Sequence, residues 1–394
     1  MALPIPTTLD EITADWLTSA LRQSEVISEK TTVLARTVEV LGVGEGFAAE
    51  LARMHLSYKN GSGPATVIAK IPTSVEDNRN GSELLGVYER ELRIYERILG
   101  EIEVSTPRLY YGDIEVNPDA ASQLERIRKM ERLPIWLLRL ILWFLIRFNK
   151  AKTFPSVLIM EDLSPAEAGD QVQGCDLDRA GEALEAVALL HAATWGDRCP
   201  QERYWLVSSA VAPRLFHAGA LGARRGFLKN FGRLLSDHTR ELYESTRTDN
   251  IERTIRLHRE VPQCMLHGDF RLDNMFFARD GGFRALIDWQ LSSFGPAVSD
   301  IAYFICGSID PGVSEAEIDA LLARYHRALE SAGVSDYPLE DLHAHYTEQL
   351  LLLLARMASV DLLDLGDQDG RGADLVSVWI ERLDARMARA SSGR

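Results

Sequence analysis

Three oxygen-bearing side chains stand close together in the second half of the sequence, where they could hold a metal ion and accept a proton. Asp269 and Asn274 are five residues apart in a polar segment. Asp288 follows a short predicted strand after the Asp-Gly-Gly turn at 280–282, and such a hairpin folds Asp288 back beside Asn274. Phosphoryl transfer from a nucleotide needs a carboxylate that accepts the alcohol proton and hard oxygen ligands for Mg²⁺. The spacing therefore predicts a phosphoryl-transfer site.

A second set of residues, in the N-terminal part of the chain, is suited to binding the phosphates of a nucleotide. Gly42, Gly44 and Gly46 occupy a turn between two runs of strand-forming residues, and their missing side chains let backbone N–H groups approach phosphate oxygens. Lys70 lies in a later predicted strand, and Glu91 lies in the predicted helix after it. A strand lysine held by a helix glutamate directs its ammonium group to the α- and β-phosphates. This order of motifs predicts a nucleotide-binding site of the kinase type.

Each of these residues also has an ordinary structural interpretation when it is taken alone. Glycine hairpins are common, and Lys70 by itself is typical of a lysine at the edge of a sheet. Arg271 and Asp273 could be the working groups in place of Asp269, and His267 is typical of a structural hydrogen-bonding residue. The order and spacing of the complete set favour the kinase-like interpretation, because chance rarely assembles all five parts in sequence.

The elements that must position these residues form two predicted lobes, an α+β arrangement. Residues 1–160 are predicted to form an N-terminal nucleotide-binding lobe with an antiparallel β-sheet and a helix, and residues 161–394 a larger, mainly helical lobe for catalysis and substrate binding. Strands are expected at 31–41, 47–58, 65–71, 108–111 and 155–161. Helices are expected at 8–21, 82–99, 177–194, 213–243 and 250–260. A β-rich stretch at 265–289 interrupts the helical lobe and carries the polar site.

The charge of the chain argues against nucleic acid as its main partner. The sequence holds 43 Lys and Arg against 58 Asp and Glu, a net charge of -15 at pH 7, and phosphate backbones repel such a chain. Its four cysteines form no CxxC pair, which is typical of thiols in a reducing compartment. The first residues lack the basic and apolar regions of a secretory signal. These features predict a cytoplasmic protein.

A basic and apolar insert at 126–152 departs from this acidic composition. It holds eight basic residues and one acid, Glu131, a net charge of +7. Its apolar part at 134–148 is interrupted by Arg139 and is shorter than the roughly 20 residues that cross a bilayer. Three interpretations stay open: a helix packed on the N-terminal lobe with its arginines turned outward, a helix bound to an anionic membrane surface, or a flap over an apolar substrate.

Several strings in the sequence resemble a known superfamily. The His-Gly-Asp string at 267–274, the Ile-Asp-Trp-Gln string at 287–290 and the segment 299–304 resemble the aminoglycoside phosphotransferase and choline kinase superfamily, and most of all its ecdysteroid kinase-like branch. The segments 157–163 and 190–195 also look like the interlobe hinge and a C-lobe helix of that superfamily. The resemblance implies a bilobal protein-kinase-like fold and transfer of the γ-phosphoryl group of ATP, with Mg²⁺, to a hydroxyl of a small molecule.

The resemblance also implies a role for individual residues of this chain. Asp269 is the expected base, and Asn274 and Asp288 are the expected metal ligands. The expected nucleotide-binding residues are Gly42, Gly44, Gly46, Lys70, Glu91, Glu161 and Leu163, the last two through their backbone, and Asp300 is expected to support the catalytic loop. The acceptor alcohol is expected to be either cationic, like choline or an aminoglycoside, or apolar, like a steroid. Tyr346, Asp361, Asp364 and Trp379 are candidates for the wall of its site.

Two other functions are alternatives to the small-molecule kinase. A nucleotide-binding regulatory or scaffold protein of kinase fold is disfavoured because the set of catalytic residues is complete. A protein kinase is disfavoured by the His-Gly-Asp and Asp-Trp-Gln strings and by the missing Ala-Pro-Glu segment.

Overall fold

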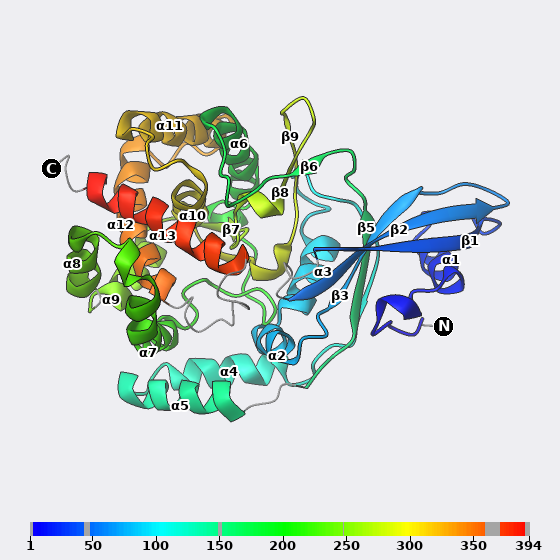
Figure 1. Cartoon of the computed structure of the whole chain (residues 1–394), viewed down its shortest axis with the longest axis horizontal. Helices are drawn as coiled ribbons and strands as arrows, with labels where there is room; N and C mark the ends of the chain where they lie inside the picture. Colours follow the sequence, from blue (N-terminus) through cyan, green and yellow to red (C-terminus); the bar gives the residue numbers. More distant parts are fainter. Residues whose placement is uncertain (1–2, 43–47, 149–151, 247, 359–370, 391–394) are drawn as a thin grey trace. The chain divides into compact units, whose positions relative to one another are not determined.

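The computed structural model describes the chain except for residues 1–2, 43–47, 149–151, 247, 359–370 and 391–394. The chain divides into two compact units. The first comprises Met1–Glu101, Thr106–Ala120 and Lys150–Pro165, and the second comprises Ile102–Ser105, Ala121–Asn149 and Ala166–Arg394. A five-stranded antiparallel sheet dominates the first unit and helices dominate the second, so the expected α+β class is confirmed (Figure 1).

The sheet of the first unit has the strand order β1-β2-β3-β5-β4, and every neighbouring pair is antiparallel. The strands expected from the sequence are present, because alternate residues bury one side of the sheet. Helix α1 (Ala14–Gln23), which the Thr13 side chain caps, packs on β1, and Trp16, Leu17 and Met54 belong to the core beneath it. The strands are β1 (Thr32–Leu41), β2 (Ala49–Lys59), β3 (Thr66–Pro72), β4 (Leu109–Ile114) and β5 (Ser156–Glu161).

Two helices predicted as continuous are each divided in the structure. The helix expected at 82–99 is α2 (Glu76–Leu85) followed by α3 (Val87–Arg97). Gly86 separates them in the left-handed conformation, with φ of 64°, and its N–H group bonds to the Glu83 carbonyl at the end of α2. The helix expected at 213–243 is likewise α7 (Pro213–Phe231) and α8 (Asp237–Thr246).

The second unit packs its helices around a buried central helix, α10 (Val298–Ser308), which contacts α6, α12 and α13. Two small sheets are set among these helices. One pairs β7 (Gln263–Leu266) with β10 (Ser293–Pro296), and the other has the order β6-β8-β9. The remaining strands are β6 (Glu167–Ala168), β8 (Met275–Phe277) and β9 (Phe283–Leu286). The remaining helices are α6 (Leu177–Ala193), α9 (Asn250–Glu260), α11 (Glu315–Ser331), α12 (Leu339–Ala358) and α13 (Arg371–Ala390).

The basic insert belongs to the second unit, whereas one interpretation of the sequence expected it to form a helix packed on the N-terminal lobe. It forms α4 (Ala120–Met130) and α5 (Ile135–Phe148), and 121–149 belong to the second unit. Helix α5 packs against α7. The Glu131 carboxylate accepts hydrogen bonds from the backbone N–H groups of Arg214, at 3.0 Å, and Leu215, at 2.8 Å, in the first turn of α7. The insert therefore caps a helix of the second unit.

None of the described helices combines the length and the apolar character needed to span a bilayer, α5 included.

Burial makes the four thiols poor nucleophiles in the native protein. All four cysteines are free, and Cys264 and Cys306 have no exposed surface. Burial raises the pKa of Cys199 to about 11 and the pKa values of Cys175 and Cys306 to about 12.

We therefore expect a thiol-specific reagent to label the native protein slowly at mildly alkaline pH, because thiolate is the reactive form and little is present. The same protein in denaturant should label rapidly at all four cysteines. Stoichiometry can be followed by mass spectrometry. Rapid labelling of any native cysteine would show that its thiol is more accessible than the fold implies.

Candidate active site

The polar site predicted from the sequence lies on a loop between two strands of the second unit. Strand β7 ends at Leu266, a short 3₁₀ turn covers Leu272–Asn274, and β8 begins at the next residue. The backbone carbonyl of Asn274 accepts a hydrogen bond of 3.0 Å from the N–H group of Ile287. This bond puts Asp288, which directly follows, beside the end of the loop. The hairpin therefore brings Asn274 and Asp288 together as the sequence predicted, with Asp269 on the same loop.

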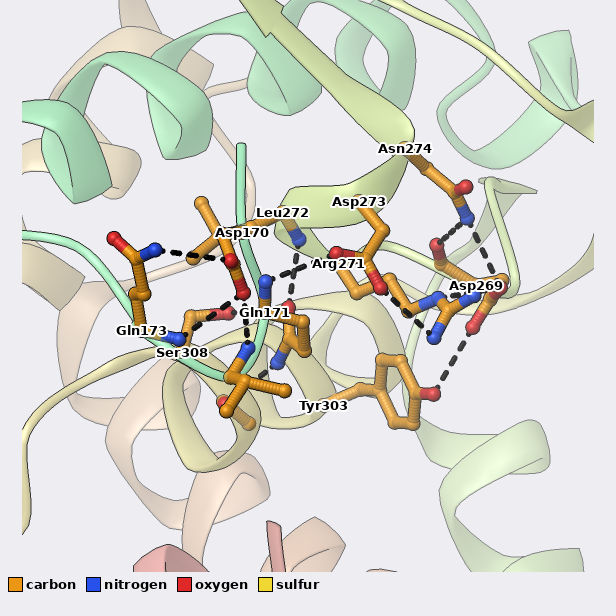
Figure 2. A network of polar contacts seen from close by, with 12 residues as sticks. Asp170, Gln171, Gln173, Asp269, Arg271, Leu272, Asp273, Asn274, Tyr303 and Ser308 are labelled. Carbon is orange, nitrogen blue, oxygen red and sulfur yellow. Dashed lines mark hydrogen bonds and ion pairs between the residues drawn. The ribbon is translucent and has the colours of Figure 1, made fainter. Parts of the chain in front are cut away.

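Three side chains hold the carboxylate of Asp269 in place (Figure 2). The Tyr303 hydroxyl donates to Oδ1 at 3.0 Å. Arg271 Nε donates to Oδ2 at 3.1 Å, and Asn274 Nδ2 donates to the same oxygen at 2.9 Å. Asn274 Nδ2 also bonds to the Asp269 carbonyl at 2.9 Å, which closes the loop on itself. The carboxylate is thus oriented before any substrate arrives.

The surroundings of Asp269 keep its carboxylate ionised. Burial by itself raises the pKa of this group, but the charges of Arg271 and His267, the Tyr303 hydrogen bond and the charge of Arg356 together lower the pKa below its ordinary value. Arg356 also lies over the ring of Tyr303, 5.0 Å from its centroid. The nearby Asp269 carboxylate in turn raises the pKa of Arg271, so this pair is charged at neutral pH.

Arg271 and Asp273, the alternative working groups, take up supporting positions instead. Arg271 lies between the two carboxylates, with Nη1 3.4 Å from Asp273 Oδ2. Asp273 Oδ1 accepts a hydrogen bond of 3.0 Å from the backbone N–H of Gln171. These contacts tie the loop to the segment that follows β6, and they leave Asp269 as the better candidate for contact with a substrate.

Asn274 and Asp288 fit a magnesium ion that is also bound by phosphates. Both donations from Asn274 come from Nδ2, so its Oδ1 is the atom suited to a metal, and Asp288 supplies a carboxylate from a left-handed turn with φ of 66°. The described residues contain no cluster of three or more His, Cys, Asp or Glu that could hold a metal by itself. Magnesium commonly binds through one or two protein oxygens together with substrate phosphates, and the two residues match that pattern.

Asp300 supports the start of the loop, as the sequence predicted. Its buried carboxylate accepts hydrogen bonds from the backbone N–H groups of His267, at 2.7 Å, and Gly268, at 3.0 Å. His191 Nε2 lies 3.3 Å from the same carboxylate. Gly268 has φ of +82°, and a Cβ there would lie 2.0 Å from the Leu291 carbonyl oxygen, so the turn requires glycine.

His267 has the structural role expected for it. Its side chain is fully buried, and Nε2 lies 2.9 Å from the carbonyl oxygen of Ile287. Because a carbonyl only accepts, Nε2 carries the proton of this hydrogen bond. His267 thereby joins the loop to the residue before Asp288.

Gln171 is a supporting residue that the sequence did not reveal (Figure 2). Its buried side chain accepts a hydrogen bond of 2.7 Å from the N–H group of Leu272 and donates one of 2.5 Å to the Gly307 carbonyl. Arg382 Nη1 donates to its backbone carbonyl at 2.7 Å. No motif surrounds Gln171, and its partners lie about a hundred or more residues away in the sequence. The residues next to it in the sequence therefore gave no indication of its role.

The lysine and glutamate of the first unit form a buried ion pair. Lys70 Nζ, on β3, lies 2.8 Å from the carboxylate oxygens of Glu91, on α3. The exposed fractions of the two residues are 7% and 1%. This is the strand–helix pairing that the sequence predicted. Gly42 is described, with φ of 60°, whereas Gly44 and Gly46 lie outside the described residues.

The end of β5, where the backbone is expected to receive adenine, is held by a backbone hydrogen bond and by an ion pair. The N–H group of Glu161 donates to the Arg108 carbonyl at 2.8 Å, so this amide is already used within the protein. Asp162 accepts a hydrogen bond of 2.7 Å from Arg53 Nε. Leu163, two residues after the strand, is buried.

The candidates for the acceptor wall are only partly described. Tyr346 and Trp379 are both buried, and Asp361 and Asp364 lie outside the described residues. The rings of Trp379 and Tyr303 are 5.1 Å apart, so Trp379 packs on the tyrosine that bonds to Asp269. This contact links Trp379 indirectly to the loop that carries Asp269.

Replacing Asp300 by Asn should loosen the loop and destabilise the fold. An amide keeps the shape but offers one acceptor and one donor group, so one of the two backbone N–H groups faces another donor. We expect the free energy of unfolding to fall by about 1–3 kcal/mol, the cost of a buried unsatisfied polar group. Urea unfolding measures it, with Asp280→Asn on an exposed turn as the control. Equal stability of the two variants would contradict this role for Asp300.

Two solved structures share this fold. A choline kinase from Cryptosporidium parvum Iowa II is 11% identical, with 96% of each chain covered and a TM-score of 0.54. A microcompartment-associated aminopropanol kinase is 14% identical, with 96% of this chain and 98% of that chain covered and a TM-score of 0.50. At these identities the likeness concerns the fold.

A shorter match connects the chain to curated proteins. The rat and mouse proteins called acyl-CoA dehydrogenase family member 11 are 45% and 43% identical to it over 42 residues. That segment is 10% of this chain and 5% of the length of those relatives.

The family comparison covers far more of the chain. The model described as the ecdysteroid kinase-like family matches residues 43–333, which include Lys70, Glu91, Asp269, Asn274 and Asp288. Together with the kinase fold, this match indicates a small-molecule phosphotransferase. The chain belongs to the ecdysteroid kinase-like family.

Proposed function

We propose that this protein transfers the γ-phosphoryl group of ATP to a hydroxyl of a small molecule, with Asp269 as the base. The observation that carries the proposal is the Asp269 carboxylate, which Arg271, Asn274 and Tyr303 hold in place on the loop that the hairpin joins to Asp288. Its surroundings lower its pKa below the ordinary value, which favours the ionised form. Such positioning accounts for most of the catalysis in phosphoryl transfer, because the reaction requires little covalent chemistry from the protein.

Asp269 accepts the proton that the alcohol loses. An acceptor hydroxyl donates a hydrogen bond to the carboxylate, beside or in place of the Tyr303 hydroxyl at Oδ1. As the oxygen–phosphorus bond forms and the bond to the ADP oxygen breaks, the proton moves from the hydroxyl to Asp269. Arg271 and Asn274 keep the other oxygen, Oδ2, in position throughout.

Asn274 Oδ1 and the Asp288 carboxylate would hold Mg²⁺ together with phosphate oxygens. The ion, when bound, neutralises the charge that develops on the transferred group. Because the described residues contain no cluster of three or more His, Cys, Asp or Glu that could hold a metal, we expect little metal binding without nucleotide. Asp288 is the stronger ligand of the two, since it carries the charge.

Lys70 would neutralise the α- and β-phosphates. Its pairing with Glu91 holds the ammonium group at one position on β3, so less side-chain freedom is lost when a phosphate binds. The Gly42–Gly46 turn and the backbone from Glu161 to Leu163 complete the proposed nucleotide contacts, with the Glu161 amide excepted because it bonds to Arg108.

The acceptor class is the least constrained part of the proposal. The family name points to a polycyclic, largely apolar alcohol, and the excess of acidic residues after residue 160 suits a cationic alcohol such as choline or an aminoglycoside. Both classes carry the hydroxyl that the proposed chemistry needs. A reducing compartment such as the cytoplasm suits the four free cysteines.

A transfer assay over a panel of alcohols tests the function. Purified protein with γ-labelled ATP and Mg²⁺ is incubated with sterols, amino alcohols, aminoglycosides and hydroxyacyl compounds, and labelled products are separated. We expect label in at least one class.

Asp269→Asn should lower kcat by roughly 10² to 10⁴ while nucleotide binding, measured by calorimetry, persists. Asp288→Asn should abolish the extra thermal stabilisation that Mg²⁺ gives in the presence of ATP.

Two outcomes discriminate between the functions, and a third tests the role of Asp269. Stabilisation by ATP without transfer to any acceptor would favour a nucleotide-binding regulatory protein. Transfer to protein in a mixed protein sample would favour a protein kinase. A kcat unchanged in Asp269→Asn would refute its role as base, with Asp280→Asn on an exposed turn as the matched control.

The low pKa of Asp269 sets the pH dependence of turnover. The ionised carboxylate is the active form, so kcat should fall only as the pH drops through a pKa below the ordinary aspartate value of about 4. Arg271→Gln removes the largest of the attractive charges that lower this pKa, and the acid limb of kcat should then move to higher pH. A lower kcat with an unmoved acid limb would contradict the electrostatic role of Arg271.

A further inference from the structure

Helix α5 exposes a row of large apolar side chains. Trp136, Leu140, Trp143 and Phe144 have exposed fractions of 67%, 55%, 60% and 58%. Their spacing of four, three and one residues places them on one side of the helix, since an α-helix turns once in 3.6 residues. Such a contiguous patch of tryptophan, leucine and phenylalanine is unusual on the surface of a monomeric protein.

The opposite side of α5 is docked on the second unit. Leu138 has no exposed surface, and α5 packs against α7 (Figure 1). Glu131, just before α5, caps α7, and Arg214 Nη2 donates to the Leu133 carbonyl at 3.0 Å. Helix α5 is therefore held to α7 both along the side opposite the apolar row and at its start. This attachment disfavours a mobile flap over the substrate.

The insert that carries this row is rich in basic side chains. The insert carries a net charge of +7 in a chain of net charge -15. Its acid, Glu131, is turned toward α7, whereas Arg126, Lys129, Arg132 and Arg139 are exposed. Arg128 is paired with Glu125 and with Glu202, so it adds little to the local field. Because charges in physiological salt act over only about 8 Å, an approaching surface meets the insert as a cation.

We propose that α5 lies flat in the headgroup region of an anionic lipid bilayer, with Trp136, Leu140, Trp143 and Phe144 inserted among the acyl chains. Helix α5 has 14 residues, which is too short to cross a bilayer, and it contains the charged Arg139. This length and composition suit a helix that lies in the interface. Tryptophan favours this depth, and the exposed arginines and lysine are placed to meet anionic headgroups.

A second copy of this chain is the less favourable occupant of the face. In a twofold symmetric dimer each patch meets its own equivalent, so the basic residues of one insert would face those of the other. A lipid surface of opposite charge covers the same apolar area and attracts the cations. Charge complementarity therefore selects the membrane.

Vesicle flotation tests the proposal and requires no enzymatic activity. We expect the protein to float with vesicles of phosphatidylcholine and phosphatidylserine, to float less with phosphatidylcholine alone, and to be released by salt. Trp136→Ser with Trp143→Ser should weaken binding by roughly tenfold or more, since two inserted indoles are lost. Arg132→Glu with Arg139→Glu should remove the preference for anionic lipid. Leu189→Ser, on the exposed side of α6, is the matched control and should bind as the parent does.

Tryptophan fluorescence reports directly on the inserted face. Of the seven tryptophans, only Trp136 and Trp143 are exposed. The others are buried: Trp16, Trp195, Trp205, Trp289 and Trp379. Anionic vesicles should therefore shift the emission to the blue and protect the protein from an aqueous quencher, and brominated lipids should quench it. Trp136→Phe with Trp143→Phe should abolish these signals and retain flotation, because phenylalanine preserves the apolar face.

Several results would overturn the proposal. Absence of flotation with anionic vesicles would do so, as would equal binding of the serine double variant whose melting temperature matches the parent's. Light scattering that shows a dimer of the parent and a monomer of the serine variant, without lipid binding, would assign the face to a second copy.

Discussion

The rest of the site depends on the hydrogen bonds that the buried Asp300 carboxylate accepts from the backbone of His267 and Gly268. The loop that carries Asp269 leaves β7 through a turn that only glycine can make, and such a turn exposes two consecutive backbone N–H groups inside the protein. A charged acceptor satisfies both, and a buried bond to a charged group is stronger than one between neutral groups. His191 approaches the same carboxylate and lies 2.9 Å from the Tyr325 hydroxyl, which connects the loop to α11.

The remainder of the loop is held from two other sides, for the same reason. An irregular segment in the interior must find partners for its backbone groups outside regular structure. Gln171 supplies one for Leu272, and Ile287 supplies one for Asn274. The side chains of the candidate site are therefore placed by a backbone that is itself hydrogen-bonded at its beginning, middle and end.

The parts predictable from the sequence are those whose partners are near in the chain or joined by regular elements. The hairpin brings Asn274 to Asp288, and a strand followed by a helix brings Lys70 to Glu91. The hydrogen bond between Gln171 and Leu272 joins residues 101 positions apart, and the one between Glu131 and the start of α7 joins residues 83 positions apart. No sequence pattern connects such distant partners, so neither the role of Gln171 nor the docking of the insert could be predicted. Gly86 shows another limit, because hydrophobic periodicity continues across the break between α2 and α3.

The electrostatics of Asp269 constrain the order of events in the proposed reaction. A carboxylate whose pKa is lowered by Arg271 is a weak base toward an alcohol in its ground state. The hydroxyl becomes acidic only once its oxygen has begun to bond to phosphorus. The proton must therefore move late, as expected for a loose transition state in which the nucleophile carries little bond order. Until then, the main contribution of Asp269 is to orient the hydroxyl, and the donors to Oδ1 and Oδ2 serve that purpose better than a higher pKa would.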